Sequence, residues 1–340
     1  MTDIVAWFHH GRDAERFDIC QSHPAVLERG VAVVVCTYRR PKSLHRFLDS
    51  LGAQADACDQ LVVVDASPDD ATERAVRDQL CGAPDSLARS ILYVRVAGSL
   101  RGLTRQRNVA LRWVATDLVA FFDDDIVLGT GCLRELERVH RELRDAVAGV
   151  GALIEDELGP ATPLWRVRRA LRLVPRLEPG RYFRSGISTP WNVSPAAAPF
   201  VDGDWLHGGA TMWKTAAVRA ERFSEQLGGY GQGEDLEFSL RVRAHGRLVV
   251  ASAARVRHLH EATARPDAFR MGYMAIHNRW QIHRRALRDR TWRDVLWFAY
   301  AWTADTMLLA RHVIKPRRIA PTIAHVLGRC AAAVDLVRGR

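Results

Sequence analysis

The stretch VAVVVCTYRRP (residues 31–41) joins an unbroken apolar run to polar residues and a proline. A strand that is buried on both faces has such a continuous run, because neither side of it meets water. Proline fixes the backbone angle needed in a first helical turn. Leu44, Phe47, Leu48 and Leu51 then recur at helical spacing. The stretch therefore predicts a buried strand that is followed at once by a helix.

Four more apolar runs repeat this scheme, and helical patterns separate them. Strand–helix–strand order indicates parallel pairing, because the helix carries the chain back along the sheet. The sequence therefore predicts an open, doubly wound α/β sheet. The expected strands are 60–65, 91–96, 118–122 and 147–154, and the expected helices are one with Ser67 as N-cap and Pro68 as first residue, one over 103–115 and one that carries Leu133, Leu136 and Val139.

Charge is distributed unevenly along the 340 residues. The formal net charge is +10, yet the segment from Arg255 to Arg340 holds 17 basic and 6 acidic residues, so the rest is nearly neutral. This tail has several tryptophans on amphipathic helical patterns. Two interpretations stay open: helices packed on the body under arginine stems, or docking on an anionic membrane surface. The apolar stretch 295–310 is interrupted by Asp305 and is too short to cross a membrane.

The cysteines and the N-terminus indicate the compartment. Six cysteines are scattered without a CxxC pair, which is typical of reduced, buried thiols. The first 18 residues contain no apolar core long enough for a signal peptide. We therefore expect a cytoplasmic protein, which the second interpretation of the tail would place peripherally on the inner face of the membrane.

Three adjacent aspartates, Asp123 to Asp125, directly follow the expected strand 118–122. An isolated acidic triplet is most often a solvated loop. This one stands at the carboxyl end of a buried strand, where open α/β sheets bind their ligands. Carboxylates at positions i and i+2 suit Mg²⁺ or Mn²⁺. Thr37 and Tyr38 follow another expected strand, Asp65 ends a third, and all converge on the same edge. We therefore expect a metal site that binds a diphosphate there.

The loop GSLRGLTRQRN (residues 98–108) leads into a helix N-terminus, which is a natural anion site. Arg101 precedes the helix and is the residue expected to face a phosphate. The alternative for Arg101, Arg105 and Arg107 is a surface helix whose arginines pair with acids, and the pattern leaves both open.

Two further motifs carry candidate chemistry. Glu234 and Asp235 begin a helix after a glycine-rich run, where acids either stabilise the helix dipole or reach a substrate hydroxyl as a general base. His258 and His260 flank one residue of an expected strand, so both rings point to one face. Such a pair either binds a metal or is structural.

The chain at this point resembles the inverting family-2 glycosyltransferases of the GT-A fold. The ordered motifs that carry the resemblance span about residues 30 to 265 and are VVVCTYRRP, VVVDAS, RG-x4-RN, FFDDD, GGATMW, GEDLEFSLR and VRHLH. The resemblance implies a GT-A type doubly wound mixed sheet with C-terminal amphipathic helices. The expected domains are an N-terminal extension (1–30), a glycosyltransferase domain (31–265) with a variable proline-rich insert (155–200), and a basic helical appendage (266–340).

The resemblance also implies roles for individual residues. Asp235 would be the general base, with Glu234 as the next candidate. Asp123 and Asp125 would hold Mg²⁺ or Mn²⁺, and His258 would be a later contact to the metal or to the diphosphate. The residues expected to bind the nucleotide are Thr37, Tyr38, Arg40, Asp65, Arg101, Arg107 and Asp124, of which Asp124 would meet the ribose.

The implied reaction moves a sugar from a nucleotide diphosphate-sugar to an acceptor hydroxyl with inversion. The acceptor class stays open among a glycan, a lipid-linked glycan and a small metabolite. Ala66 stands where many family members have an acidic or amide residue that reads the base. The nucleotide of the donor therefore stays open among UDP, GDP and dTDP. One rival is a sugar-nucleotide nucleotidyltransferase, but CTYRRP replaces the glycine-rich basic loop it needs. The other is a basic nucleic-acid-binding protein, but the body is near neutral and carries no such motif, so we expect no nucleic-acid partner.

Overall fold

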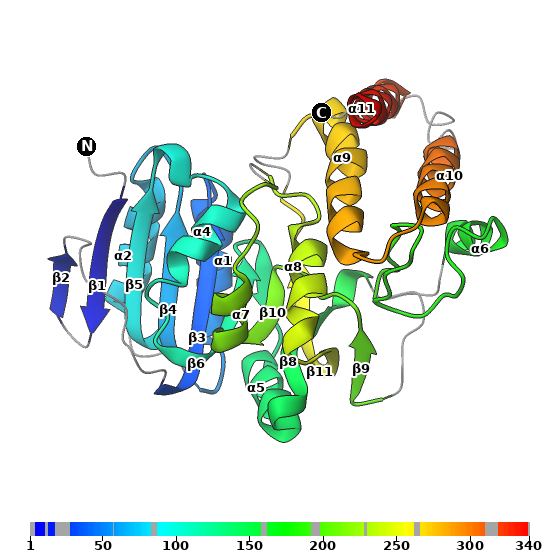
Figure 1. Cartoon of the computed structure of the whole chain (residues 1–340). Helices are drawn as coiled ribbons and strands as arrows, with labels where there is room; N and C mark the ends of the chain where they lie inside the picture. The colour runs from blue at the N-terminus through cyan, green and yellow to red at the C-terminus, as the bar shows by residue number, and fades with distance from the viewer. Residues whose placement is uncertain are drawn as a thin grey trace. The chain divides into compact units, whose positions relative to one another are not determined.

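The computed structural model describes residues 4–10, 13–17, 28–56, 58–82, 87–157, 162–191, 198–227, 230–261, 266–309 and 319–338. The chain divides into two compact units (Figure 1). Unit 1 consists of Met1–Leu158 and Ala196–Ala264, and unit 2 of Gly159–Pro195 and Arg265–Arg340. Each unit is therefore built from two separate segments of the chain.

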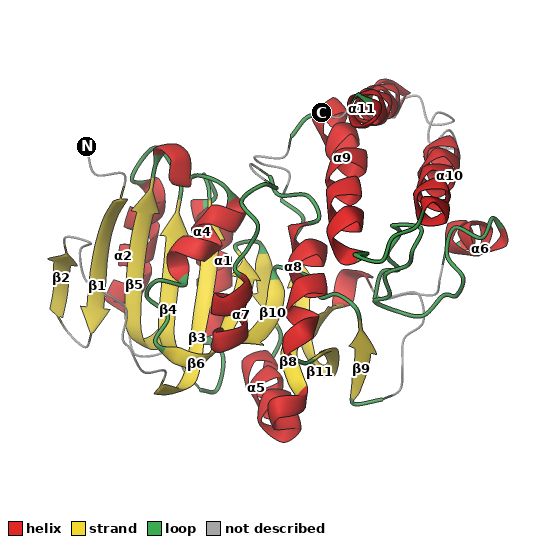
Figure 2. Ribbon diagram, in the orientation of Figure 1, coloured by secondary structure: helices red, strands yellow, loops and turns green. Residues whose placement is uncertain are grey.

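Unit 1 is built on a mixed sheet with helices on its faces (Figure 2). Its parallel part has the order β5-β4-β3-β6. A second part follows, in which β10 is antiparallel to both β6 and β8, and β11 is parallel to β8. The strands are β3 (Glu28–Thr37), β4 (Cys58–Asp65), β5 (Ala88–Val96), β6 (Thr116–Asp123), β8 (Val147–Ile154), β10 (Ala210–Lys214) and β11 (Arg247–His258).

Shorter strands extend this sheet beyond what the sequence predicted. In the N-terminal extension, β1 (Ile4–His10) adds antiparallel to β5, and β2 (Asp13–Phe17) adds to β1. On the other side, β7 (Ile126–Leu128) and β9 (Phe200–Gly203) each pair antiparallel with β11. The long strand β11 thus connects three other strands, and its carboxyl end lies beside the turn that leads into β7.

The five predicted strands are confirmed, since each lies within β3, β4, β5, β6 or β8. The buried core contains the apolar side chains of these strands together with those of α1 (Pro41–Gly52) and α5 (Cys132–Leu143). Both helices are confirmed, and Pro41 stands in the first turn of α1 as expected. β8 does not neighbour β6, however, because the antiparallel strand β10 lies between them.

Two predicted helix boundaries are wrong. Helix α2 (Ala71–Gly82) does not begin at Pro68 with Ser67 as its N-cap. The side chain of Asp65 accepts a hydrogen bond from the backbone N–H of Ser67 (2.8 Å), which holds these residues in a turn before the helix. Helix α4 (Leu103–Ala110) ends five residues earlier than the predicted 103–115, in turns that still bury Leu111 and Val114.

Unit 2 contains the helices α6 (Pro163–Ala170), α9 (Ala268–Ala286), α10 (Trp292–Leu308) and α11 (Ile319–Val337). Its buried apolar cluster takes residues from both segments of the chain, namely Leu173, Val174, Phe183, Ile187 and Ala301. Ion pairs also join the two segments: Arg168 contacts Asp305 at 2.5 Å, and Arg184 contacts Asp294 at 2.7 Å. The segment 159–195 is thereby part of the same core as the C-terminal helices.

Helices α9 and α11 cross closely through two glycines. A Cβ at Gly272 would overlap the carbonyl oxygen of His325, and one at Gly328 would overlap that of Phe269. Among the described residues, α11 is the one helix that has both the length and the apolar composition to cross a membrane, with 17% of its window buried. The stretch 295–310, which the sequence singled out as most apolar, instead corresponds to α10.

Candidate active site

The acidic triplet lies at the carboxyl end of the parallel strands. Asp123 is the last residue of β6, and Asp124 and Asp125 form the turn into β7. The backbone N–H of Asp123 donates to the carbonyl of Gly209 (3.0 Å). A Cβ at Gly209 would overlap the carboxylate of Asp123, so a larger residue here would displace that carboxylate.

Asp124 is buried against the end of β3. One carboxylate oxygen accepts from the hydroxyl of Thr37 (2.7 Å) and the other from Arg40 (3.0 Å). Burial raises the pKa of Asp124 to about 7, and the hydrogen bond from Thr37 and the charge of Arg40 offset only part of this. The structure thus brings three of the expected nucleotide-binding residues into direct contact.

Asp125 is held by the end of β11 and the residues that follow it. Its carboxylate lies 3.1 Å from Nε2 of His258 and accepts from the backbone N–H of Glu261 (3.0 Å). Its own carbonyl accepts from the N–H of Leu259 (2.9 Å). Burial alone would raise the pKa of Asp125, but the hydrogen bond and charge of His258, with a smaller effect of Arg40, lower it below its usual value.

Asp123, Asp125 and His258 form a group with the geometry of a cation site. One potential ligand atom from each residue lies within 4.8 Å of the others. Two carboxylates and one imidazole are a donor set that fits Mn²⁺, and the carboxylates alone also suit Mg²⁺. The three residues that the sequence named as metal ligands are therefore neighbours, and their chemistry fits the expected ion.

Arg107 is almost fully buried beside this group, with 2% of its surface exposed. It donates one hydrogen bond to Glu234 (2.8 Å) and one to Asp123 (3.2 Å). Its guanidinium also lies near the rings of Phe121 and Phe223, 5.7 and 5.2 Å from their centroids. Arg107 therefore links the start of helix α8 (Glu234–Val242) to the acidic turn, as a buried bridge between two carboxylates.

Glu234 and Asp235 lie in different surroundings, although they are adjacent in the chain. Glu234 is buried, and burial raises its pKa to about 8 even though Arg107 offsets part of that effect. The other oxygen of Glu234 is buried and has no hydrogen-bond partner among the residues that the structure describes. Asp235 is only half-buried, and its carboxylate accepts from the backbone N–H of Leu236 (2.7 Å). Of the two, Asp235 is the more accessible carboxylate.

The remaining expected nucleotide residues differ in their environment. Asp65 is fully buried and accepts from the hydroxyl of Tyr93 (2.8 Å) as well as from Ser67. Tyr38 is half-buried at the end of β3. Arg101 is exposed after the short turn η1 (Gly98–Leu100), and no hydrogen bond or ion pair within the described residues links it to the other site residues.

Sequence reasoning missed Gln106. Its side-chain amide donates to the carbonyl of Thr37 (3.1 Å) and to that of Val64 (2.9 Å). These bonds hold together the ends of β3 and β4, from which Thr37 and Asp65 project. Its position directly before Arg107, on a helix that also buries Val109 and Ala110, was the available signal.

A basic hollow borders the acidic turn. It has a volume of about 650 Å³ and is lined by Arg39, Arg40, Lys42 and Arg46, with Glu261 at its edge. Arg40 belongs both to this hollow and to the pairs with Asp124 and Asp125. The site thus places positive side chains directly beside the carboxylates that could hold a cation.

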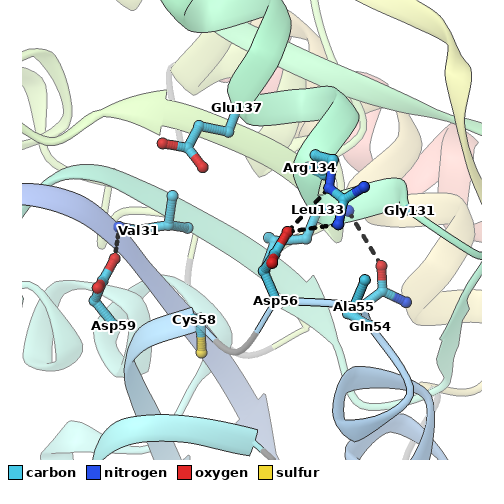
Figure 3. Close-up of a pocket in the computed structure, with 10 residues that line it drawn as sticks. All are labelled: Val31, Gln54, Ala55, Asp56, Cys58, Asp59, Gly131, Leu133, Arg134 and Glu137. Carbon is cyan, nitrogen blue, oxygen red and sulfur yellow. Dashed lines mark hydrogen bonds and ion pairs between the residues drawn. The ribbon is translucent and has the colours of Figure 1, made fainter.

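A smaller hollow of about 50 Å³ lies at the opposite end of the strands (Figure 3). Val31 and Cys58, near the amino ends of β3 and β4, line it, and Arg134 closes it through an ion pair with Asp56 (2.8 Å). Open α/β sheets bind ligands at the carboxyl ends of their strands. This hollow is therefore separate from the candidate site.

The comparisons with known proteins agree with this geometry. A family model described as Glycosyl transferase family 2 matches residues 32–200. The chain carries a family-2 glycosyltransferase domain. The matched range includes Thr37, Arg107 and the acidic triplet, whereas Asp235 and His258 of the glycosyltransferase lie beyond it.

Solved structures show the same fold. A mannosyltransferase from Pyrobaculum calidifontis, solved in complex with GDP-mannose and Mn²⁺, is similar with a TM-score of 0.54 and 19% identity, over 92% of this glycosyltransferase and 88% of that chain. The structure of GalNAc-T7 with UDP, GalNAc and Mn²⁺ is similar with a TM-score of 0.52 and 15% identity, over 71% of this chain and 45% of that one. No curated protein matches the sequence. The GT-A fold expected from the sequence is confirmed.

Proposed function

We propose that this glycosyltransferase moves a sugar from a nucleotide diphosphate-sugar to an acceptor hydroxyl, with inversion and with the help of Mn²⁺ or Mg²⁺. The observation that carries the proposal is the group of Asp123, Asp125 and His258 at the carboxyl edge of the sheet. These residues would hold a divalent ion, which would neutralise the charge that develops on the leaving diphosphate. The adjacent basic hollow around Arg40 favours an anionic donor for the same electrostatic reason.

The nucleotide would lie across the ends of β3, β4 and β6. Thr37, Asp65 and Asp124 end these strands or follow them directly, and Gln106 holds the first two strands in register. In this arrangement Tyr38, Arg40 and Arg101 border the nucleotide from the surface. Arg107 is too deeply buried to be a surface contact, and we assign it the role of positioning Asp123 and Glu234.

Asp235 is the proposed general base. It stands at the N-terminus of α8 and is half-buried, so it can accept a proton from a hydroxyl group that approaches the site. Glu234 is committed to Arg107 and buried. In-line attack by the deprotonated hydroxyl on the anomeric carbon inverts its configuration in one displacement.

Two substitutions test the metal and the base separately. Asp125→Ala should abolish the increase in affinity for UDP, GDP or dTDP that Mn²⁺ produces, as measured by calorimetry with and without the ion. Asp56→Ala, which removes an exposed aspartate far from the site, is the matched control. Wild-type nucleotide binding and full transfer activity in Asp125→Ala, or in the presence of EDTA, would contradict the metal role.

Asp235→Asn keeps the shape of the side chain and removes its basicity. Donor binding should persist, while the rate of transfer should fall by about 10²–10⁴-fold, the usual contribution of a general base. Glu234→Gln is the comparison that separates the two carboxylates. Loss of donor affinity with unchanged turnover in Asp235→Asn would instead identify Asp235 as a binding or capping residue.

For the acceptor, we propose a molecule at an anionic membrane surface on the cytoplasmic side. Unit 2 contains 22 basic and 6 acidic residues, whereas unit 1 contains 27 basic and 33 acidic ones. Two helices of unit 2 also carry exposed apolar side chains, on α10 at positions 292, 296, 300 and 307 and on α11 at positions 319, 323, 327, 334 and 337. Basic and exposed apolar side chains together favour an anionic lipid surface.

Liposome sedimentation tests this part of the proposal. The protein should sediment with anionic phosphatidylglycerol vesicles at low salt and poorly with phosphatidylcholine vesicles, which carry no net charge. Sedimentation with phosphatidylglycerol should decrease as salt rises, because salt screens the contribution of each arginine. The double substitution Trp292→Ser with Leu327→Ser should weaken binding, and Tyr230→Ser in unit 1 should not. If the wild-type protein ignores anionic vesicles at low ionic strength, a soluble acceptor becomes the better proposal.

A further inference from the structure

A second group of potential cation ligands lies beside the first. Glu157, His258 and His260 each offer a ligand atom within 4.8 Å of the others. His258 is a member of both groups, whereas Glu157 and His260 belong to the second alone. The two groups therefore share one imidazole.

The pairing of β8 with β11 brings these side chains together. The two strands are parallel, with Ile154 beside Val256 near their carboxyl ends. Glu157 closes the short turn η3 (Glu155–Glu157) directly after β8, and His258 is the last residue of β11. Asp156, the residue before Glu157, ties this turn to β11, because its carboxylate accepts a hydrogen bond from the backbone N–H of His258 (2.9 Å). The arrangement thus follows from the strand register and not from a free loop.

The backbone after β11 turns His260 back over His258. The sequence predicted both rings on one face of a strand, but His260 lies beyond the strand and has a φ of 52°. This left-handed conformation is uncommon for a residue other than glycine and concentrates at functional sites. The two ring centroids are only 4.1 Å apart. The neighbouring N–H groups of Leu259 and Glu261 are both bonded to Asp125, so the turn is fixed.

We propose that Glu157, His258 and His260 form a second cation site that takes Zn²⁺. Two imidazoles and one carboxylate are a donor set that Zn²⁺ uses with an open position. A third histidine lies near this carboxylate, with Nε2 of His207 3.4 Å from Glu157. The set is richer in nitrogen than the first group, so it discriminates against Mg²⁺.

The shared histidine makes the two sites antagonistic. A neutral imidazole has one nitrogen with a free lone pair, because the other carries the proton. His258 can therefore bind one cation at a time, and Zn²⁺ at the second site withdraws it from the group with Asp123 and Asp125. The antagonism rests on the proposed role of that first group, whereas the Zn²⁺ site itself does not.

Zn²⁺ binding to the metal-free protein tests the site directly. Competition with a chromophoric chelator should show one Zn²⁺ bound per chain, with an affinity that falls at least about tenfold in Glu157→Gln and in His260→Ala. His45→Ala, at an exposed histidine paired with Asp49, should leave the affinity unchanged. Asp123→Ala should keep Zn²⁺ binding, because Asp123 belongs to the first group alone.

Mn²⁺ displacement tests the antagonism. Paramagnetic resonance should show that Zn²⁺ releases bound Mn²⁺ from the wild-type protein at a lower Zn²⁺ concentration than from His260→Ala, in which Zn²⁺ can displace Mn²⁺ only by direct competition at the first group. Unchanged Zn²⁺ affinity in both Glu157→Gln and His260→Ala, or its loss in Asp123→Ala instead, would overturn the second site. Because the chelator measurement needs no sugar transfer, its outcome is independent of whether the proposed glycosyl transfer is correct.

Discussion

Arg107→Met is expected to destabilise unit 1 strongly, because it leaves a buried carboxylate without its partner. Arg107 and Glu234 are 2% and 7% exposed and lie 2.8 Å apart. Removing one partner of such a buried pair costs about 3–5 kcal/mol. We expect the lower end, about 3 kcal/mol, since the raised pKa of Glu234 lets it take up a proton near neutral pH. Loss of the contact between Arg107 and Asp123 adds little to this cost, because the side chain of Asp123 is 35% exposed and stays hydrated.

Amide hydrogen exchange of β3, β4 and β6 is the appropriate assay, because these strands report the opening of unit 1 alone. The double substitution Arg107→Met with Glu234→Gln removes the unpaired charge as well, so it should recover about half of the lost stability. Arg107→Lys should be only slightly more stable than Arg107→Met, since an ammonium group cannot reproduce the two diverging hydrogen bonds of the guanidinium. A cost below about 1 kcal/mol for Arg107→Met, or no recovery in the double variant, would refute the reasoning.

Two further substitutions probe the acidic turn and the acid stability of the sheet. Gly209→Ala should displace the carboxylate of Asp123 and weaken Mn²⁺ binding at least about tenfold. Helix content by circular dichroism should change little. Unchanged Mn²⁺ affinity would contradict the close packing of Gly209 against Asp123. His140 is buried with a pKa lowered to about 4 by burial, so the unfolded state binds its proton more tightly. Stability should therefore fall by about 3 kcal/mol as pH drops from 6.5 to 4, and His140→Gln, but not His45→Gln, should flatten that fall in urea titrations.

The parallel half of the sheet could be predicted because its strands are buried on both faces and thus read as unbroken apolar runs. The strand β7 could not, since its three residues give no period, and only pairing with β11 makes them a strand. The start of α2 was misplaced because Ser67 and Pro68 satisfy the pattern of a helix start. The carboxylate of Asp65, which holds them in a turn, acts through tertiary structure that the local pattern does not contain.

The candidate site divides in the same way. Thr37, Asp65 and the acidic triplet could be placed together because carboxyl ends of neighbouring parallel strands meet at one edge. The bridge from Arg107 to Glu234 could not be foreseen, since 127 residues separate them and the backbone of Gly208 packs directly against both side chains. The same holds for the proximity of Glu157 to His258, which depends on the register between β8 and β11.

The two-segment construction of unit 2 has a consequence for the order in which the protein is made. Leu173, Val174 and Phe183 emerge from the ribosome before the whole second segment of unit 1, yet they pack around Ala301. At about 5–20 residues per second, their partners follow after a delay on the order of 10 s. During that delay the nascent chain carries an unsatisfied apolar surface, so biosynthesis has an interval in which aggregation competes with folding and in which a chaperone gains most from binding.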